Sequence, residues 1–209
     1  IYVWIDALFN YITALGLADH ESDRYKELSA FWPASYHIIG KEILWFHAVI
    51  WPAVLIALDL PLPKCIYAHS FWISEGKKMS KSLGNFIDLE TAESYIEKYN
   101  LDAWRYYLVT QGPLGATDAD FVSDRFQDIY NAHLVNTVGN STSRVTAMIN
   151  KYFDGVVPSE MDGKTRIEIS GFDWPAKCDA AFLAWDKAME AFELTKAIEE
   201  AMNLIRDVD

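Results

Sequence analysis

Short apolar runs alternate with longer helix-like segments over residues 1–73 of the chain. The runs "IYVWI" (1–5), "YHII" (36–39) and "KCIYAHSFWI" (64–73) predict buried strands. Between them, the spacing of apolar residues predicts helices over 7–15 and 41–58. A chain that alternates strand and helix in this way is typical of a parallel α/β sheet, in which ligands bind beyond the carboxyl ends of the strands.

The helix predicted over 41–58 carries apolar residues on almost every face, so we expect it to be covered on most sides. Pro52 is expected to kink this helix, because proline removes a backbone donor from a helix interior. In the helix before it, Asp6 is the predicted N-cap and Gly16 the residue that ends the helix.

After the third predicted strand the pattern changes to helices separated by turns. Asp88 and Asp102 are predicted to cap helices over 89–99 and 103–111. The turn-rich segment "GPLGATDAD" (112–120) follows them, and it predicts a domain boundary.

Two long helices are predicted beyond that boundary, over about 122–150 and 179–209, because apolar residues recur there at three- and four-residue steps. The connector between them contains the β-like "TRIEI" (165–169). The fold class predicted is therefore α/β over 1–117, followed by an all-α antiparallel helical bundle over 118–209. The chain opens inside an apolar run and stops before the bundle is complete, so we expect a piece of a longer protein.

Composition and charge narrow the classes of protein that fit. The net charge of -12 excludes a protein that coats nucleic acid nonspecifically, although lysines can still act together at one local site. Cys65 and Cys178 lack metal-ligand spacing, so we expect a reducing, cytoplasmic setting, with no zinc site and no disulfide scaffold. The longest apolar run, 43–58, is too short for a membrane span, and no membrane partner is expected.

The segment "GKKMSKSLGN" (76–85) concentrates lysines in this acidic chain. Ammonium groups and serine hydroxyls suit phosphate oxygens, and Gly76 and Gly84 permit the segment to move. One interpretation is a mobile cationic loop that closes over a polyphosphate and neutralises the charge of the transition state. The other is a solvated basic turn before the next helix, which the composition taken alone favours.

Five segments carry a resemblance to a known family. They are "YVWIDALFNYITALG" (2–16), "HIIGKEILWFHAVIWPAVL" (37–55), "GKKMSKSLGN" (76–85), "DAWRYYLV" (102–109) and "NTVGNSTSRV" (136–145). In order and in spacing they resemble methionyl-tRNA synthetases, a family of class I aminoacyl-tRNA synthetases. The resemblance implies the second half of a Rossmann-like catalytic domain, followed by part of a helical anticodon-binding domain. It also implies an enzyme that activates methionine with ATP and Mg²⁺ to methionyl-adenylate and transfers the methionyl group to tRNA(Met).

Within the resemblance, "KMSKS" (78–82) corresponds to the family's second signature. It implies that Lys81 stabilises the pyrophosphate in the activation step, with Lys78 and Ser80 in support.

The resemblance also assigns Gly40 and Glu42 to the nucleotide. Gly40 permits close approach of a ligand, and Glu42 is implied to accept hydrogen bonds from ribose hydroxyls. The family more often has Asp in place of Glu42 and Gly in place of Ser70, which leaves the geometry near ribose and adenine open. From the residues alone, Glu42 fits equally well as a stabiliser of the helix N-terminus.

Six residues are implied to form a methionine pocket. A thioether is apolar and polarisable, and it packs well beside aromatic rings. Periodicity alone favours the alternative, which is ordinary core packing. The implied pocket residues are Trp4, Ala7, Leu8, Tyr11, Ile43 and His47.

In the helical region, the resemblance implies that Asn140 and Arg144 read the tRNA anticodon. They are four residues apart and so share a helix face, from which an amide and a guanidinium can reach bases. The alternative is an exposed polar helix face without a ligand.

The family's first signature, His-Ile-Gly-His, is not in this sequence; "HIIG" (37–40) resembles it superficially. We therefore expect this fragment to be inactive alone and the parent protein to be the enzyme. Two other functions stay open from the sequence: a class I synthetase of the Ile, Val, Leu or Cys type, and a noncatalytic tRNA-binding module.

Overall fold

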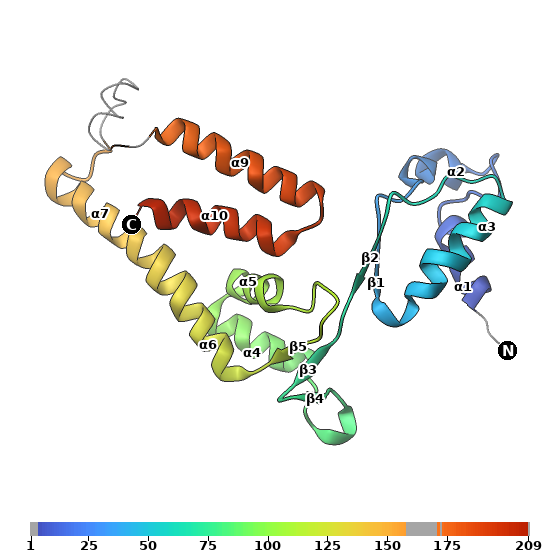
Figure 1. The fold of residues 1–209 in the computed structure, drawn as a ribbon, viewed down its shortest axis with the longest axis horizontal. Coiled ribbons are helices and arrows are strands. Elements are labelled where there is room, and N and C mark those ends of the chain that lie inside the picture. Colours follow the sequence, from blue (N-terminus) through green and yellow to red (C-terminus); the bar gives the residue numbers. More distant parts are fainter. Residues whose placement is uncertain (1–3, 158–170, 172, 209) are drawn as a thin grey trace. The chain divides into compact units, whose positions relative to one another are not determined.

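The computed structural model describes residues 4–157, 171 and 173–208, and its chain forms two compact units (Figure 1). The first unit comprises residues 1–73 and 113–119, and the second comprises 74–112 and 120–209. The predicted boundary after residue 117 thus lies inside a short segment that packs with the first unit. The assignment of 1–117 and 118–209 to two functional domains stays a prediction.

The first helix, α1 (Trp4–Thr13), begins inside the run predicted to be a strand. Residues 1–3 lie outside the described residues, and for Trp4 and Ile5 the strand prediction is wrong. Asp6 accordingly lies in the first turn of α1 and does not precede it. The reason is packing: Leu8 and Ile12, one helical turn apart, are both buried, so a helix covers the core with one face.

A parallel pair of strands forms the sheet of the first unit. β1 (Tyr36–Gly40) pairs with β2 (Cys65–His69), from Tyr36 opposite Cys65 to Gly40 opposite His69. The two predicted strands are confirmed here, although the second ends at His69 and resumes as β3 (Trp72–Ser74). Ahead of β1, the chain forms α2 (Asp23–Leu28) and the 3₁₀ turn η1 (Ser29–Phe31).

The crossover between β1 and β2 is helical, as predicted, but its geometry changes along its length. It contains the 3₁₀ turn η2 (Lys41–Ile43), the π-helical η3 (Phe46–Ile50) and α3 (Trp51–Ala57). Pro52 lies in the first turn of α3, directly after the π-helical segment. At that position proline's missing N–H costs little, because the first turn of a helix leaves its donors unpaired.

The expectation that this crossover is covered on most sides is wrong within the described residues. His47, Trp51 and Leu55 are buried and share one face. The side chains of Trp45 and Ile56 point elsewhere and are 65% and 67% exposed. The described elements of the first unit cover one face of this helix, although apolar residues occur on all of its faces.

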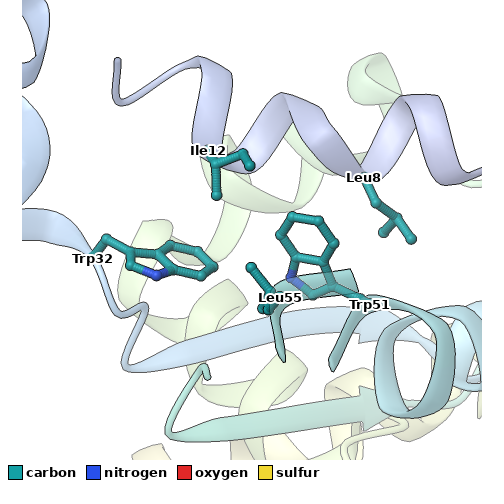
Figure 2. Close-up of a cluster of buried hydrophobic side chains, with 5 residues drawn as sticks. All are labelled: Leu8, Ile12, Trp32, Trp51 and Leu55. Atoms are coloured by element: carbon teal, nitrogen blue, oxygen red, sulfur yellow. The ribbon is translucent and has the colours of Figure 1, made fainter. Parts of the chain in front are cut away.

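The core of the first unit gathers around Trp51, which is completely buried (Figure 2). Leu8 and Ile12 reach it from α1, while Trp32 and Leu55 close the cluster from the chain before β1 and from α3. The Trp32 and Trp51 rings meet edge to face, with their centroids 6.2 Å apart.

A short sheet and two helices follow β2 in the chain. The sheet has the order β4 (Lys77–Lys78), β3, β5 (Ala119–Phe121). The helices are α4 (Leu89–Tyr99) and α5 (Leu101–Gln111).

The caps of these two helices were predicted from Asp88 and Asp102. Asp88 caps α4, and its carboxylate accepts a hydrogen bond from the Thr91 N–H at 2.9 Å, as predicted. Asp102 does not cap α5: Asn100 does, by accepting from the Ala103 N–H at 2.9 Å. Asn100 has a φ of 79° and a ψ of 164°, which is not a helical conformation, so this one residue ends α4 and precedes α5.

Beyond β5, three helical segments follow one another without a break (Figure 1). They are α6 (Ser123–Ile129), the π-helical η5 (Tyr130–Gly139) and α7 (Asn140–Phe153). The predicted helix over about 122–150 is therefore confirmed, with a change of helix type in its middle.

The single helix predicted over 179–209 is two helices, α9 (Trp174–Glu190) and α10 (Leu194–Val208), which lie side by side in opposite directions (Figure 1). Phe192 turns the chain between them with a φ of 59°. The pattern hid this turn because no glycine or proline marks it. The "TRIEI" segment lies outside the described residues.

Aromatic side chains form the core of the second unit, and Phe126 of α6 lies at its centre. Its ring is buried and lies 4.8 Å, centroid to centroid, from both Tyr95 of α4 and Tyr107 of α5. Phe121 of β5 joins the same cluster, 5.6 Å from Tyr107. β5 is thus packed against the two helices that follow the lysine segment.

None of the helices described is both long enough and apolar enough to cross a membrane.

Replacing Trp51 by alanine should lower the local stability of the first unit by about 3–5 kcal/mol, because the lost indole leaves a cavity in the core. Trp45→Ala is the matched control: that indole is 65% exposed, and its loss should cost less than about 0.5 kcal/mol. Native-state hydrogen exchange of the β1 and α3 amides measures both. Equal losses in the two variants would contradict the described core.

Candidate functional site

Two of the predicted pocket residues meet directly. The hydroxyl of Tyr11, on α1, lies 3.0 Å from Nε2 of His47, in η3. The other ring nitrogen of His47, Nδ1, lies 3.0 Å from the Ile43 carbonyl oxygen, which can only accept. In the neutral form of the ring, this contact places the proton on Nδ1, and the Tyr11 hydroxyl then donates to Nε2. Burial raises the pKa of Tyr11, so its hydroxyl stays protonated as the donor.

His37 belongs to the same cluster, although the sequence analysis did not assign it to the site. Its ring lies 4.5 Å from that of Tyr11 and 6.0 Å from that of His47, centroid to centroid. The indole N–H of Trp51 donates to His37 Nε2 at 3.2 Å. Burial is the main cause that lowers the pKa of His37, and electrostatic repulsion between the protonated forms of His37 and His47 is the second, so the neutral imidazole of His37 is favoured. His37 is marked out by being a polar residue at a buried strand position, and burial cannot be seen in the sequence.

The remaining predicted pocket residues differ in their surroundings. Trp4 is 38% exposed and stacks on Phe46 at a centroid distance of 4.9 Å and an interplanar angle of 22°. Leu8 is buried in the core around Trp51, whereas Ala7 is exposed. The structure therefore brings Tyr11, His47 and the Ile43 carbonyl into one hydrogen-bonded set. Trp4, at the start of α1, stacks on Phe46.

Gly40 and Glu42 lie at the carboxyl end of β1. The carboxylate of Glu42 folds back over Gly40 so closely that a Cβ on Gly40 would lie 2.4 Å from Glu42 Oε2. Glycine is required at this position for the side chain of Glu42 to take that place. Glu42 itself is exposed, so its oxygens can be reached from solvent.

The residues that follow β2 form hydrogen bonds with the segment 113–119. The Ser70 N–H donates to the Pro113 carbonyl at 2.9 Å, and Asp118 accepts from the Phe71 N–H at 3.1 Å. Lys41, just after β1, forms an ion pair with Asp118 at 2.6 Å, and this ammonium together with the Phe71 N–H lowers the pKa of Asp118. The hydroxyl of Ser70 is buried and has no hydrogen-bond partner in the part of the chain that is described.

The lysine segment begins with a tight hairpin turn. Glu75 and Gly76 join β3 to β4, and their φ angles are 50° and 71°. Two consecutive left-handed residues match a type I′ hairpin turn, for which glycine in the second position is well suited. Lys77 and Lys78 of β4 are exposed, and the 3₁₀ turn η4 (Lys81–Leu83) follows.

Asn85 holds the shape of this segment from within. Its side-chain oxygen accepts from the Ser80 N–H at 2.9 Å, and its Nδ2 donates to the Lys78 carbonyl at 3.3 Å. The Ser80 and Ser82 hydroxyls lie 2.8 Å apart. Residues 78–85 are therefore connected by hydrogen bonds, and the lysine loop (76–85) presents Lys77 and Lys78 to solvent.

Asn140 and Arg144 are both exposed on α7, one turn apart. They are placed on the same helix face, as the spacing predicted. Their role in reading RNA stays a prediction.

Within the described residues, no group of three or more His, Cys, Asp or Glu side chains is arranged to hold a metal ion. Cys65 and Cys178 are both free thiols.

A family model described as "tRNA synthetases class I (M)" matches residues 1–146. This match includes the Tyr11–His47 cluster, the lysine loop and the start of α7.

Among curated proteins, the chain is 42% identical to the methionine–tRNA ligase of Bacillus subtilis (strain 168) over 205 residues, which is 98% of this chain and 29% of that protein. It is 49% identical to the methionine–tRNA ligase of Caldanaerobacter subterraneus subsp. tengcongensis over 158 residues, which is 76% of this chain and 24% of that protein. The chain thus spans less than a third of the length of these relatives.

Among solved structures, the chain matches methionyl-tRNA synthetase of Mycobacterium tuberculosis in complex with methionyl-adenylate, with a TM-score of 0.77 and 32% sequence identity. The match covers 99% of this chain and 38% of that one. The apo form of the same protein gives a TM-score of 0.73 and 29% identity. Because the family model covers more than half of the chain and the relatives agree with it, the chain belongs to the class I tRNA synthetases (M), as a partial segment of that enzyme.

Proposed function

We propose that this chain is part of a methionine–tRNA ligase that activates methionine with ATP to methionyl-adenylate and then transfers the methionyl group to tRNA(Met). Residues 1–117 contribute the second half of a Rossmann-like catalytic domain, and 118–209 begin the helical anticodon-binding domain. The observation that carries the proposal is the 42% identity to a methionine–tRNA ligase over 98% of the chain. Free thiols at Cys65 and Cys178 fit a cytoplasmic location, which is part of the same proposal.

Methionine binding is assigned to the cluster around Tyr11 and His47. Trp4 supplies an aromatic face suited to a polarisable thioether, and Ala7 leaves room beside it. The Tyr11 hydroxyl is committed to His47 at 3.0 Å, which holds both rings in fixed orientations. Because these two rings are already ordered, the protein loses less conformational entropy when methionine is bound.

ATP binding is assigned to two places. Gly40 and Glu42 are proposed to meet the ribose, since the carboxylate of Glu42 is exposed beside a glycine with no side chain. The lysine loop is proposed to meet the triphosphate, with Mg²⁺ entering as part of the ATP substrate. Lys81 is assigned the largest share of pyrophosphate stabilisation, and Lys78 and Ser80 support it.

Two rival functions are less well supported. A synthetase for isoleucine, valine, leucine or cysteine would share the lysine loop, but the curated relatives named above are methionine–tRNA ligases. A noncatalytic tRNA-binding module would not need the loop, which is present here with Lys77 and Lys78 exposed. ATP–pyrophosphate exchange by the full-length protein, run with a panel of amino acids, separates the three. Exchange that depends on methionine alone is expected, and exchange with another amino acid or with none would overturn the proposal.

Lys81→Ala in the full-length enzyme should lower the rate of ATP–pyrophosphate exchange by about 100-fold or more, because a charge that stabilises the transition state is lost. The KM for methionine should change little. Lys187→Ala removes an exposed lysine from α9 and serves as the matched control. An unaltered exchange rate would remove Lys81 from this role.

Tyr11→Phe keeps the aromatic ring but removes the hydroxyl that donates to His47. The KM for methionine should rise by about 3- to 10-fold, in line with one lost hydrogen bond. Tyr11→Ala should raise it further, since the ring is lost as well. Tyr25→Phe in α2 controls for loss of a tyrosine hydroxyl in the same unit. A normal methionine KM in both Tyr11 variants would count against the pocket assignment.

Arg144→Ala should reduce charging of tRNA(Met) by about 10- to 100-fold, because an arginine contact to a base contributes about 1–3 kcal/mol. Adenylate formation should be unaffected, since this step does not need tRNA. Lys151→Ala, which removes another exposed cation from α7, is the control. Equal losses in charging and in adenylate formation would show that Arg144 does not act through the anticodon alone.

A further inference from the structure

We propose that Asp120 is a positioning residue for the lysine loop. Its carboxylate accepts a hydrogen bond, the latch, from the backbone N–H of Gly76 at the start of the loop. This bond thereby fixes the position of the loop relative to the triphosphate. This inference rests on the proposed function and extends it to a residue outside the sequence motif. Asp120 lies 44 residues away from Gly76 in the chain, on β5, and both residues belong to the second unit.

The hinge is at the start of the loop. Gly76 has a φ of 71°, and a Cβ built on it would meet no heavy atom within 4 Å. Gly84, at the other end, has a φ of 68° and equally open surroundings. Neither glycine has a neighbour at its Cβ position, and both have a positive φ, which glycine adopts without strain.

Asn85, which follows Gly84, bonds to the Ser80 N–H and the Lys78 carbonyl, so residues 78–85 are tied together across Gly84. Of the two glycines, Gly76 alone lies outside this hydrogen-bonded segment, and it is the hinge. A contact that restrains the hinge restrains the whole loop.

Asp120 makes that contact. Its Oδ2 accepts a hydrogen bond from the Gly76 N–H at 2.8 Å, and such a charge-assisted bond is stronger than one between neutral groups. Its other oxygen, Oδ1, is buried and accepts no hydrogen bond from the described residues. Burying an unpaired oxygen costs free energy, so stability alone gives no reason for a carboxylate here.

The strand that carries Asp120, β5, is held in place by the aromatic core of the second unit. Phe121, the next residue on β5, is buried and packs its ring 5.6 Å from Tyr95 and 5.6 Å from Tyr107. Side chains of neighbouring strand residues point to opposite faces, so the aromatic core holds β5 through Phe121 while Asp120 reaches the hinge. Positioning of the loop is thereby tied to the packing of α4 and α5.

Holding the hinge lowers the entropy that the loop loses when it engages a polyphosphate. Exposed lysines on a free segment would have to be ordered in each catalytic cycle, whereas a latched loop is partly ordered beforehand. The latch should therefore act on the activation step and leave methionine binding unchanged.

Hydrogen exchange in the full-length protein tests the latch without relying on activity. The Gly76 amide should be protected in the wild type and should exchange about 10-fold faster or more in Asp120→Ala. Asp120→Asn keeps an acceptor oxygen and should restore most of the protection. Asp128→Ala, which removes an exposed carboxylate from α6, should leave Gly76 unchanged. Equal exchange in wild type and Asp120→Ala would overturn the proposal.

Kinetics tests the consequence. Asp120→Ala should lower kcat for methionine-dependent ATP–pyrophosphate exchange by about 10- to 100-fold, as misplacement of a catalytic group can do. Rates are expressed per active site, counted from the burst of adenylate, so a smaller folded fraction does not imitate the effect. The KM for methionine should stay the same, and Asp120→Asn should recover most of kcat.

Two results would overturn the assignment: an unchanged kcat in Asp120→Ala, or an equal loss in Asp120→Asn, which would mean that the charge and not the bond to Gly76 matters. If the wild-type protein exchanges no pyrophosphate with methionine, the proposed function fails, while the amide protection of Gly76 still decides whether the latch exists.

Discussion

The burial of Trp51 is the constraint on which the first unit depends. Its indole fills the space between α1 and the crossover helix, and its N–H is bound to His37 on β1. One turn earlier on the crossover, His47 faces Tyr11 of α1. The packing that holds the helix against the sheet therefore also holds the polar cluster in place, so stability and the proposed recognition of methionine rest on the same contacts.

Electrostatics shapes the second unit differently. The lysine loop concentrates like charges in an acidic chain, and the ammonium groups of β4 are exposed to solvent. Repulsion among like charges is relieved when an anion is bound, which is consistent with the proposed contact to the triphosphate. The aromatic core around Phe126 cannot supply that charge, but it supports β5 and hence the carboxylate of Asp120 at the loop's hinge.

Local signals in the sequence predicted the features that depend on few neighbours. The pair β1 and β2, with a helical crossover between them, follows from short apolar runs with a longer apolar segment in between. Asp88 caps α4 because a carboxylate before a helix bonds to N–H groups three residues on, whatever the rest of the fold is. The two glycines of the lysine loop were likewise visible as glycines that bracket a polar segment.

Features that depend on distant partners could not be read from the sequence. In the sequence, nothing distinguishes His37 or Asp120 from other strand residues. In the fold, His37 accepts a hydrogen bond from Trp51, and Asp120 accepts one from Gly76. Trp4 and Ile5 belong to an apolar run that predicted a strand, but they form the first turn of α1, whose Leu8 and Ile12 are buried. The sequence by itself determined the motif chemistry, the parallel strand pair and the helical second part, because these are encoded within a few consecutive residues. Only the tertiary structure decided which polar groups pair, since a hydrogen bond between residues 44 apart exists only where packing brings donor and acceptor together.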